Sequence, residues 1–256
     1  MKKITIFALS LFGATLVGCS SMGSMSSGSL SAITSAVAKN APLSQTEIVA
    51  GLKEALTQGV TKGVMKLAVK NGYYNDIATR IGLPEEALII TKNIAKLPGG
   101  EKLVENVVQR INAAATDAVK EATPIFVSAI KGMTFTDATK ILTGGNTAAT
   151  AYFKTKCKPA LKNLFASKIQ TSLDKKLVGD ISASSSWNTL TEQWNNVATS
   201  IVGKATGLKA VNTDLTDYLT DQAVDGLFLK IGEEETAIRT QASSRTTTLL
   251  KRVFGR

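Results

Sequence analysis

Four aspartates near the C-terminus are spaced so that a single helix would place them on one face. They are Asp214, Asp217, Asp221 and Asp225. At 100° per residue these positions fall within an arc of about 80°, and we call this arc the acidic face. Carboxylates clustered in this way bind hard cations or form ion pairs with basic side chains. The spacing therefore predicts either a charge network or a cation site.

The acidic face needs positive partners, because exposed carboxylates four residues apart on a helix repel one another. The basic residues that follow it in the chain are Arg239, Arg245, Lys251 and Arg252. We favour an ion-pair network in which Arg245 and Arg252 hold the last helix against the acidic face. The alternatives are a solvated acidic face and a site for a divalent cation or a substrate. The sequence has no EF-hand spacing, so calcium is weakly supported.

The residue inventory argues against most enzyme classes. The chain has 256 residues, two cysteines and no histidine, so it lacks the commonest general base and metal ligand. It contains no P-loop, no G-x-G-x-x-G after a strand and no G-x-S-x-G elbow. We therefore predict no catalytic residues, no metal and no cofactor. An enzyme that uses carboxylates, with or without a metal, is the third choice.

The first nineteen residues contain an export signal. Lys2 and Lys3 precede a short apolar run, and the segment ends in Leu16-Val17-Gly18-Cys19. This resembles the bacterial lipobox, in which Cys19 is acylated, for example with palmitate, and becomes the N-terminus. By the same resemblance Ser20, in place of an aspartate, favours the outer membrane. We expect residues 1–18 to be a signal peptide and Cys19 to anchor a periplasm-facing lipoprotein.

Residues 19–43 are predicted to connect the anchor to the folded domain. They begin with a Ser/Gly-rich tract that cannot bury enough apolar surface to fold, and we expect a tether with a reach of roughly 20 Å. Removal of residues 1–18 lowers the formal net charge from +10 to about +8. Because Cys19 carries lipid in this interpretation, Cys157 has no partner for an intrachain disulfide.

Two further patterns have both structural and functional interpretations. Gly51, Ala55, Gly59 and Gly63 recur every fourth residue, which favours close helix packing over a groove for an acyl chain. Between residues 146 and 177, Lys154, Lys158 and Lys162 share a helix face. This face is predicted to be solvated or, as the alternative, to dock on anionic headgroups. Nucleic-acid binding is disfavoured, because aromatic residues are scarce there.

Helical periodicity dominates the remaining 44–256 segment, and no strand pattern is convincing. Start and stop signals predict a break in a helix at Lys158-Pro159 and a polar loop over 179–186. Two aromatic groups, namely Tyr73 and Tyr74 with Arg80, and Trp187 with Trp194, are expected to pack in the core. We therefore predict an all-α, single irregular bundle of about eight to ten helices. The expected helices span about 44–70, a short helix from 84, 101–121, 123–132, 136–144, 146–177, 187–204, 214–231 and 244–253.

Several segments resemble one bacterial family. They are Glu47–Leu56, Ile130–Thr134, Leu215–Tyr218, Ala223–Phe228, Arg245–Thr247 and Leu250–Gly255. This pattern is similar to the helical lipoproteins grouped as domain of unknown function 4197. The resemblance spans nearly all of the chain beyond the tether and implies a helical periplasmic domain. It implies no activity and no catalytic residues.

The function that we expect is that of a non-enzymatic envelope lipoprotein. The leading version binds a lipid or another apolar ligand or docks at the membrane surface, and the alternative is a structural module with an envelope protein as its partner. The sequence does not identify the ligand, the partner or the oligomeric state.

Overall fold

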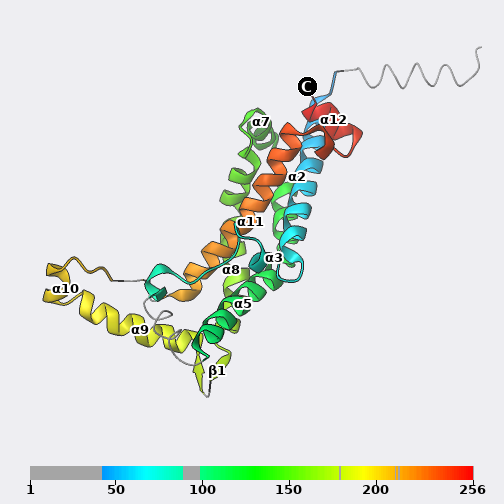
Figure 1. Cartoon of the computed structure of the whole chain (residues 1–256). Helices are drawn as coiled ribbons and strands as arrows, with labels where there is room; N and C mark the ends of the chain where they lie inside the picture. Colours follow the sequence, from blue (N-terminus) through cyan, green and yellow to red (C-terminus); the bar gives the residue numbers. More distant parts are fainter. Residues whose placement is uncertain (1–41, 89–98, 179, 211, 213, 256) are drawn as a thin grey trace, which may run out of the picture. The chain divides into compact units, whose positions relative to one another are not determined.

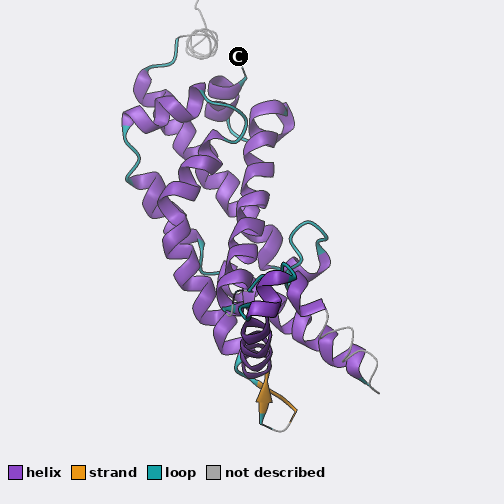
Figure 2. Cartoon of the chain, turned by 90° about the vertical axis from the view of Figure 1, so that its left-hand side faces the viewer, coloured by secondary structure: helices purple, strands orange, loops and turns teal. Residues whose placement is uncertain are grey.

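The computed structural model describes residues 42–88, 99–178, 180–210, 212 and 214–255. The predicted signal peptide, Cys19 and almost all of the tether lie outside these residues. The compact unit is Leu43–Arg256. Its described helices, shown in Figures 1 and 2, are α2 (Gln45–Ala68), α3 (Gly72–Asn75), α5 (Gly100–Val119), α6 (Thr123–Lys131), α7 (Phe135–Thr143), α8 (Ala148–Leu173), α9 (Ala183–Ala198), α10 (Ile201–Ala205), α11 (Leu215–Thr240) and α12 (Thr248–Phe254).

The all-α prediction is confirmed. Two 3-10 turns, η1 (Glu85–Ala87) and η2 (Ala242–Ser244), complete the described helical structure. One short antiparallel hairpin, which the sequence did not predict, joins β1 (Lys176–Val178) to β2 (Ile181–Ser182), with Lys176 opposite Ser182. It replaces part of the loop predicted over 179–186, and α9 starts directly after it. No helix in the described part of the chain has the length and apolar character to cross a bilayer.

Local signals explain where the main helices begin. The Ser44 side chain accepts from the Glu47 backbone, and the Glu47 carboxylate accepts from the Ser44 backbone, so the predicted capping box starts α2. An equivalent box between Thr134 and Asp137 starts α7, two residues before the predicted cap. At α11 the Asp214 carboxylate accepts from the Asp217 backbone.

The predicted break at Lys158-Pro159 is wrong, because α8 continues through Pro159 as one helix. Proline lacks the N–H for a helical bond and disfavours helical conformation in the residue before it. Core packing offsets this cost, since Phe153, Cys157, Leu161 and Phe165 of α8 are all buried on both sides of the proline.

The core lies where α8, α11 and α2 pack side by side, with α5 and α6 against them. Phe126 of α6 contacts Phe153 and Phe228 edge-on, with ring centroids 5.3 Å and 6.0 Å apart. Tyr73 of α3 is fully buried, and its hydroxyl donates to the Ala223 carbonyl oxygen at 2.8 Å. Trp187 is buried, as expected, whereas the side chain of Trp194 lies outside the described part.

Candidate functional site

The acidic face lies on α11 and is paired with lysines of α8. Lys162 Nζ is 2.8 Å from Asp217 Oδ1 and 3.2 Å from Asp221 Oδ2. Lys158 Nζ is 3.4 Å from Asp221 Oδ1 and 3.3 Å from Asp225 Oδ1. The lysine numbers rise as the aspartate numbers fall, so α8 and α11 are antiparallel. We call these five residues the lysine–aspartate ladder.

The ladder corrects the predicted partners of the acidic face. Arg245 donates instead to the carbonyl oxygens of Ile238 and Arg239, and the Arg252 guanidinium pairs with Glu47 at 3.2 Å. Thirteen residues of helix separate Asp225 from Ile238, which is about 20 Å along α11. The basic C-terminal segment therefore packs at the opposite end of α11, and it cannot reach the aspartates.

The ladder has modest energetic weight because its side chains are a third to a half exposed. Exposed pairs of this kind contribute about 0.2–1 kcal/mol each. The hydrogen bonds to Asp217 and Asp221 raise the pKa of Lys162. Burial alone would lower the pKa of Lys158, but the carboxylates of Asp225 and Asp221 outweigh it and raise this pKa. Both cations stay charged, and the ladder adds polar contacts along the interface between α8 and α11.

Metal binding finds no support at the acidic face. In the described part of the chain, no group of three or more His, Cys, Asp or Glu side chains is placed to hold a metal ion. Asp214 is occupied as the cap of α11. The other three aspartates each face a lysine ammonium, which occupies the position that a cation would need.

A carboxylate that the sequence analysis missed holds the start of α8. Glu235 of α11 accepts from the backbone N–H groups of Ala149 and Thr150, both at 2.8 Å, and from the Thr150 hydroxyl. Arg239 Nε donates to the same carboxylate at 3.1 Å, and Arg239 Nη2 donates to the Ile141 carbonyl oxygen at 2.7 Å. The α8 N-cap residue makes no side-chain capping bond. Glu235, which is 8% exposed, therefore caps α8 from a neighbouring helix.

A second ion-pair network fastens α2 and the segment after α3 to α11. Buried Lys230 lies 2.7 Å from Asp76 Oδ2 and 3.1 Å from Glu233 Oε1. Lys66 of α2 lies 2.8 Å from Glu234 Oε1 and 3.6 Å from Glu233 Oε2. The hydrogen bond from Lys230 lowers the pKa of Asp76. The network links three parts of the chain that are far apart in sequence.

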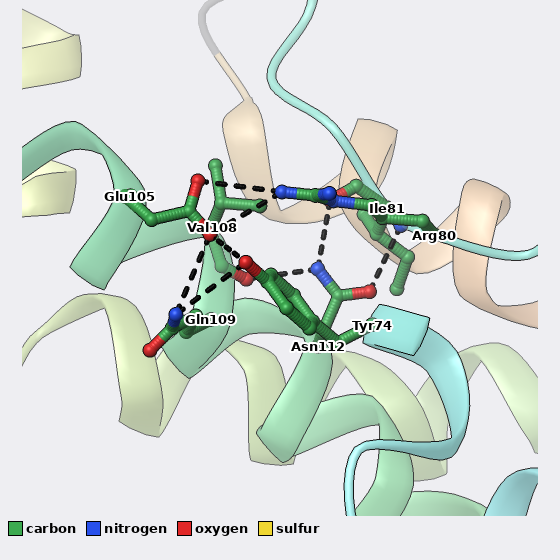
Figure 3. Close-up of polar contacts among 7 residues, drawn as sticks. All are labelled: Tyr74, Arg80, Ile81, Glu105, Val108, Gln109 and Asn112. Carbon is green, nitrogen blue, oxygen red and sulfur yellow. Dashed lines mark hydrogen bonds and ion pairs between the residues drawn. The ribbon is translucent and has the colours of Figure 1, made fainter. Parts of the chain in front are cut away.

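Figure 3 shows a polar cluster between α5 and the residues around α3. The Tyr74 hydroxyl donates to Glu105, and Arg80 Nη2 donates to both oxygens of this carboxylate at 3.3 Å. The Arg80 guanidinium also stacks on the Tyr74 ring, 4.2 Å from its centroid. Tyr74 and Arg80 thus form a surface contact rather than the core packing that we predicted. Glu105 holds α3 and the segment after it on α5.

Beneath this cluster, Asn112 clamps the backbone of Ile81. Asn112 Oδ1 accepts from the Ile81 N–H at 2.9 Å, and Asn112 Nδ2 donates to the carbonyl oxygens of Ile81 and Val108 at 2.8 Å (Figure 3). Asn112 and Ile81 are both almost fully buried. A single side chain therefore satisfies both backbone groups of a residue that has no regular secondary structure.

Gly51, Ala55, Gly59 and Gly63 form a ridge on α2, which we call the glycine ridge. It packs closely against other helices, as the favoured interpretation predicted. A Cβ at Gly63 would lie 2.9 Å from Ile231 Cγ1 and 3.1 Å from the Ile231 backbone nitrogen of α11. A Cβ at Gly51 would lie 2.7 Å from Val253 Cγ2 of α12. The cavity beside the ridge, lined by Gly59 among others, has a volume of about 20 Å³. It has room for about one water, which is far too little for an acyl chain.

Alanine at two glycines of the ridge should change the stability of the domain in opposite directions. Gly63→Ala should destabilise the domain by about 2 kcal/mol, because the new methyl group would lie 2.9 Å from Ile231 Cγ1 and 3.1 Å from the Ile231 backbone nitrogen, so the two helices must move apart. Gly59→Ala should stabilise it by about 1 kcal/mol through helix propensity, since its Cβ would meet only side-chain carbons at 3.9 Å. Urea unfolding of the two variants measures the difference. Equal effects at both positions would contradict the close approach at Gly63.

Cys157 is a structural residue of the core. Its side chain is buried, it forms no disulfide in the described part of the chain, and burial raises the pKa of its thiol to about 11. The thiolate is the reactive form of cysteine, so Cys157 is chemically inert in the folded domain.

These contacts define a class of protein, namely an all-α domain whose polar clusters join its helices to one another. The chain belongs to the family described as protein of unknown function (DUF4197), which matches residues 42–255. This confirms the resemblance found in the sequence. No curated protein and no solved structure matches the chain significantly.

Proposed function

We propose that the chain is an outer-membrane lipoprotein, anchored through lipid on Cys19, whose helical domain works at the periplasmic membrane surface without catalysis. The observation that carries the proposal is the pairing of the acidic face with Lys158 and Lys162. The carboxylates with the best spacing for chemistry serve to join α8 to α11. This pairing supports a role without catalysis, and the lipobox pattern before the domain supports the anchor.

The anchor is supported by the sequence before the domain. A basic start, a short apolar run and Gly18-Cys19 make up the lipobox pattern. The folded part begins with the capping box at Ser44, which leaves 24 residues between Cys19 and this N-cap. A lipid on Cys19 would therefore keep the domain next to the bilayer.

Labelling in cells tests the anchor. The full chain and its Cys19→Ser variant are expressed in a bacterium with an outer membrane and supplied with labelled palmitate. We expect label in the full chain, which sediments with outer membranes, and none in Cys19→Ser. Cys157→Ala is the matched cysteine control and should keep both label and location. A Cys19→Ser variant that is still labelled, or an unlabelled full chain, would overturn the proposal.

A second candidate function is the binding of an amphiphile in a surface groove between α8 and α11. The groove is open to solvent and has a volume of about 680 Å³; its lining includes Phe228, Leu229 and Gly232, and also the carboxylates Asp225 and Glu233. This volume falls within the usual range for small-molecule sites. Lys154 Nζ, 5.8 Å from the centroid of the Phe228 ring, supplies a cation for an acidic headgroup. Unlike the internal cavity, the groove is large enough for an acyl chain.

Lipid extraction tests this second function. The Cys19→Ser chain, purified under gentle conditions from its native host, should release a noncovalent lipid that mass spectrometry detects. Leu229→Asp, which places a charge in the groove lining, should abolish recovery of that lipid without unfolding the domain. Leu88→Asp, at an apolar position with similar exposure, is the control. If the purified protein carries no lipid, amphiphile binding is ruled out, and the proposal of a lipid-anchored domain is unaffected.

A further inference from the structure

The turn between α6 and α7 combines an exposed aromatic ring with lysines from four helices. Phe135 is the first residue of α7, and 52% of its surface is exposed. The lysines are Lys53 of α2, Lys131 of α6, Lys140 of α7 and Lys156 of α8. We call Phe135 and these four lysines the α6–α7 corner. Exposed aromatic residues combined with lysines are typical of segments that bind the surface of anionic membranes.

Contacts within the corner bring these lysines together. Lys53 Nζ donates to the Lys131 carbonyl oxygen at 3.3 Å, so its ammonium lies against the end of α6. Hydrogen bonds from Thr134 lower the pKa of Asp137, and the charges of Lys156 and Lys140 lower it further. Lys140 lies on α7 three residues after Asp137, and Lys156 lies on α8, which packs against α7.

The corner keeps an excess of positive charge. The Asp137 carboxylate accepts hydrogen bonds from the backbone and the side chain of Thr134, in the capping box. Glu54, the neighbour of Lys53 in the sequence, is hydrogen-bonded by Gln58. None of the four lysines forms an ion pair within the described part of the chain. The corner therefore suits an anionic surface.

The corner also lies at the end of the domain where the chain enters. Residues 43 and 44 lead directly into α2, whose first half contacts α12 at Gly51 and Val253, and α2 also packs against α7. In Figure 1, α7 and α12 lie at the same end of the domain. Glu47 pairs with Arg252 of α12, only six residues before Lys53. From Arg239 to the end, the chain contains arginines and lysine but no carboxylate side chain. A tether from residue 42 would thus start at the basic end of the domain.

We propose that the α6–α7 corner docks on the anionic phospholipid surface of the membrane, with Phe135 among the headgroups and the four lysines on lipid phosphates. The proposal rests on the proposed function in one respect: lipid on Cys19 would keep the corner beside the bilayer. The contact itself needs no lipid on the protein. It turns a freely tethered domain into one with a fixed orientation.

Vesicle binding tests the corner separately from the anchor. The chain from residue 19 onward, with Cys19→Ser, is mixed with vesicles of phosphatidylglycerol and phosphatidylethanolamine, or of phosphatidylcholine alone. We expect sedimentation with the anionic vesicles only. Each lysine near such a surface contributes about fivefold, so Lys140→Gln with Lys156→Gln should weaken binding about 30-fold. Phe135→Ser should weaken it about tenfold by removing the apolar contact.

The matched control pair is Lys70→Gln with Lys175→Gln, which removes the same charge from exposed positions beyond the far ends of α2 and α8. This pair should change binding less than threefold. Equal losses in both pairs would show attraction by net charge alone and would overturn the proposal. Absence of binding to anionic vesicles, or equal binding to phosphatidylcholine, would also overturn it. None of these results depends on whether Cys19 is acylated.

A fluorescent label then locates the contact. Because Cys157 is buried, Phe135→Cys in the Cys19→Ser chain offers a single reactive thiol for an environment-sensitive dye. Anionic vesicles should shift the emission of the dye at position 135 to the blue. The same dye at Lys175→Cys should not respond. A response at position 175 alone, or at both positions equally, would contradict docking through the corner.

Discussion

Replacing Glu235 by alanine should lower the free energy of unfolding by about 4 kcal/mol, because the change breaks a buried ion pair and uncaps a helix at once. Arg239 would be left with most of its charge buried, and the N–H groups of Ala149 and Thr150 would lose their acceptor. Urea denaturation followed by circular dichroism measures the loss. Glu235→Gln keeps the shape of the side chain, but its amide NH₂ group would face hydrogen-bond donors. We therefore expect a smaller loss of about 2 kcal/mol.

Asp225→Asn is the matched control on the same helix. Asp225 also pairs with a cation of α8, but its side chain is 52% exposed. Its loss should cost less than about 1 kcal/mol. If Glu235→Ala were as mild as Asp225→Asn, Glu235 could not be the residue that holds the start of α8.

Asn112→Ala should cost about 3 kcal/mol, since it leaves the N–H and the carbonyl oxygen of Ile81 buried without partners. The segment between α3 and η1 should separate from α5 before the rest of the domain unfolds. Hydrogen exchange at the Ile81 amide should therefore accelerate more than exchange in the middle of α8. Urea denaturation measures the loss in the free energy of unfolding, and hydrogen exchange shows which segment is affected.

Gln109→Ala provides the control for Asn112. Gln109 lies one turn earlier on α5, but it is exposed and its hydrogen bonds to Tyr74 and Glu105 are 3.4 Å long. We expect a change below about 0.5 kcal/mol. An Asn112→Ala protein with normal protection at Ile81 would show that the clamp does not hold this segment.

Local signals in the sequence predicted much of the helical framework. The Ser44 and Glu47 capping box, the apolar period after it and the glycine ridge define α2 as the structure has it, to within two residues. Such signals act within a few residues and need no knowledge of the rest of the chain. The same reasoning failed at Pro159, where the core contacts of Phe153 and Leu161 outweigh a local preference.

The polar sites were predicted less well, because their partners are distant in sequence. The spacing of the aspartates favoured an ion-pair network with the C-terminal arginines, whereas in the structure the cations are Lys158 and Lys162, more than fifty residues before the aspartates. Periodicity indicates which residues share a face, but it does not indicate which helix covers that face. The four-residue spacing of these two lysines matches that of Asp217 and Asp221, and this match was the available signal.

The role of Glu235 had no comparable signal. Glu233, Glu234 and Glu235 are adjacent in the chain, and only the packing of α11 against α8 brings one of them to the start of a helix. Asn112 likewise gains its role from Ile81, 31 residues before it. Contacts of this kind arise from tertiary packing and cannot be read from local sequence.

The N-terminal peptide of the protein, isolated from envelopes of its native host, tests the central claim most directly. Mass spectrometry should find a chain that starts at Cys19 and carries a diacylglyceryl group on sulfur, with residues 1–18 removed. A mature chain that starts elsewhere, or an unmodified Cys19, would contradict the account of this helical domain as an anchored module.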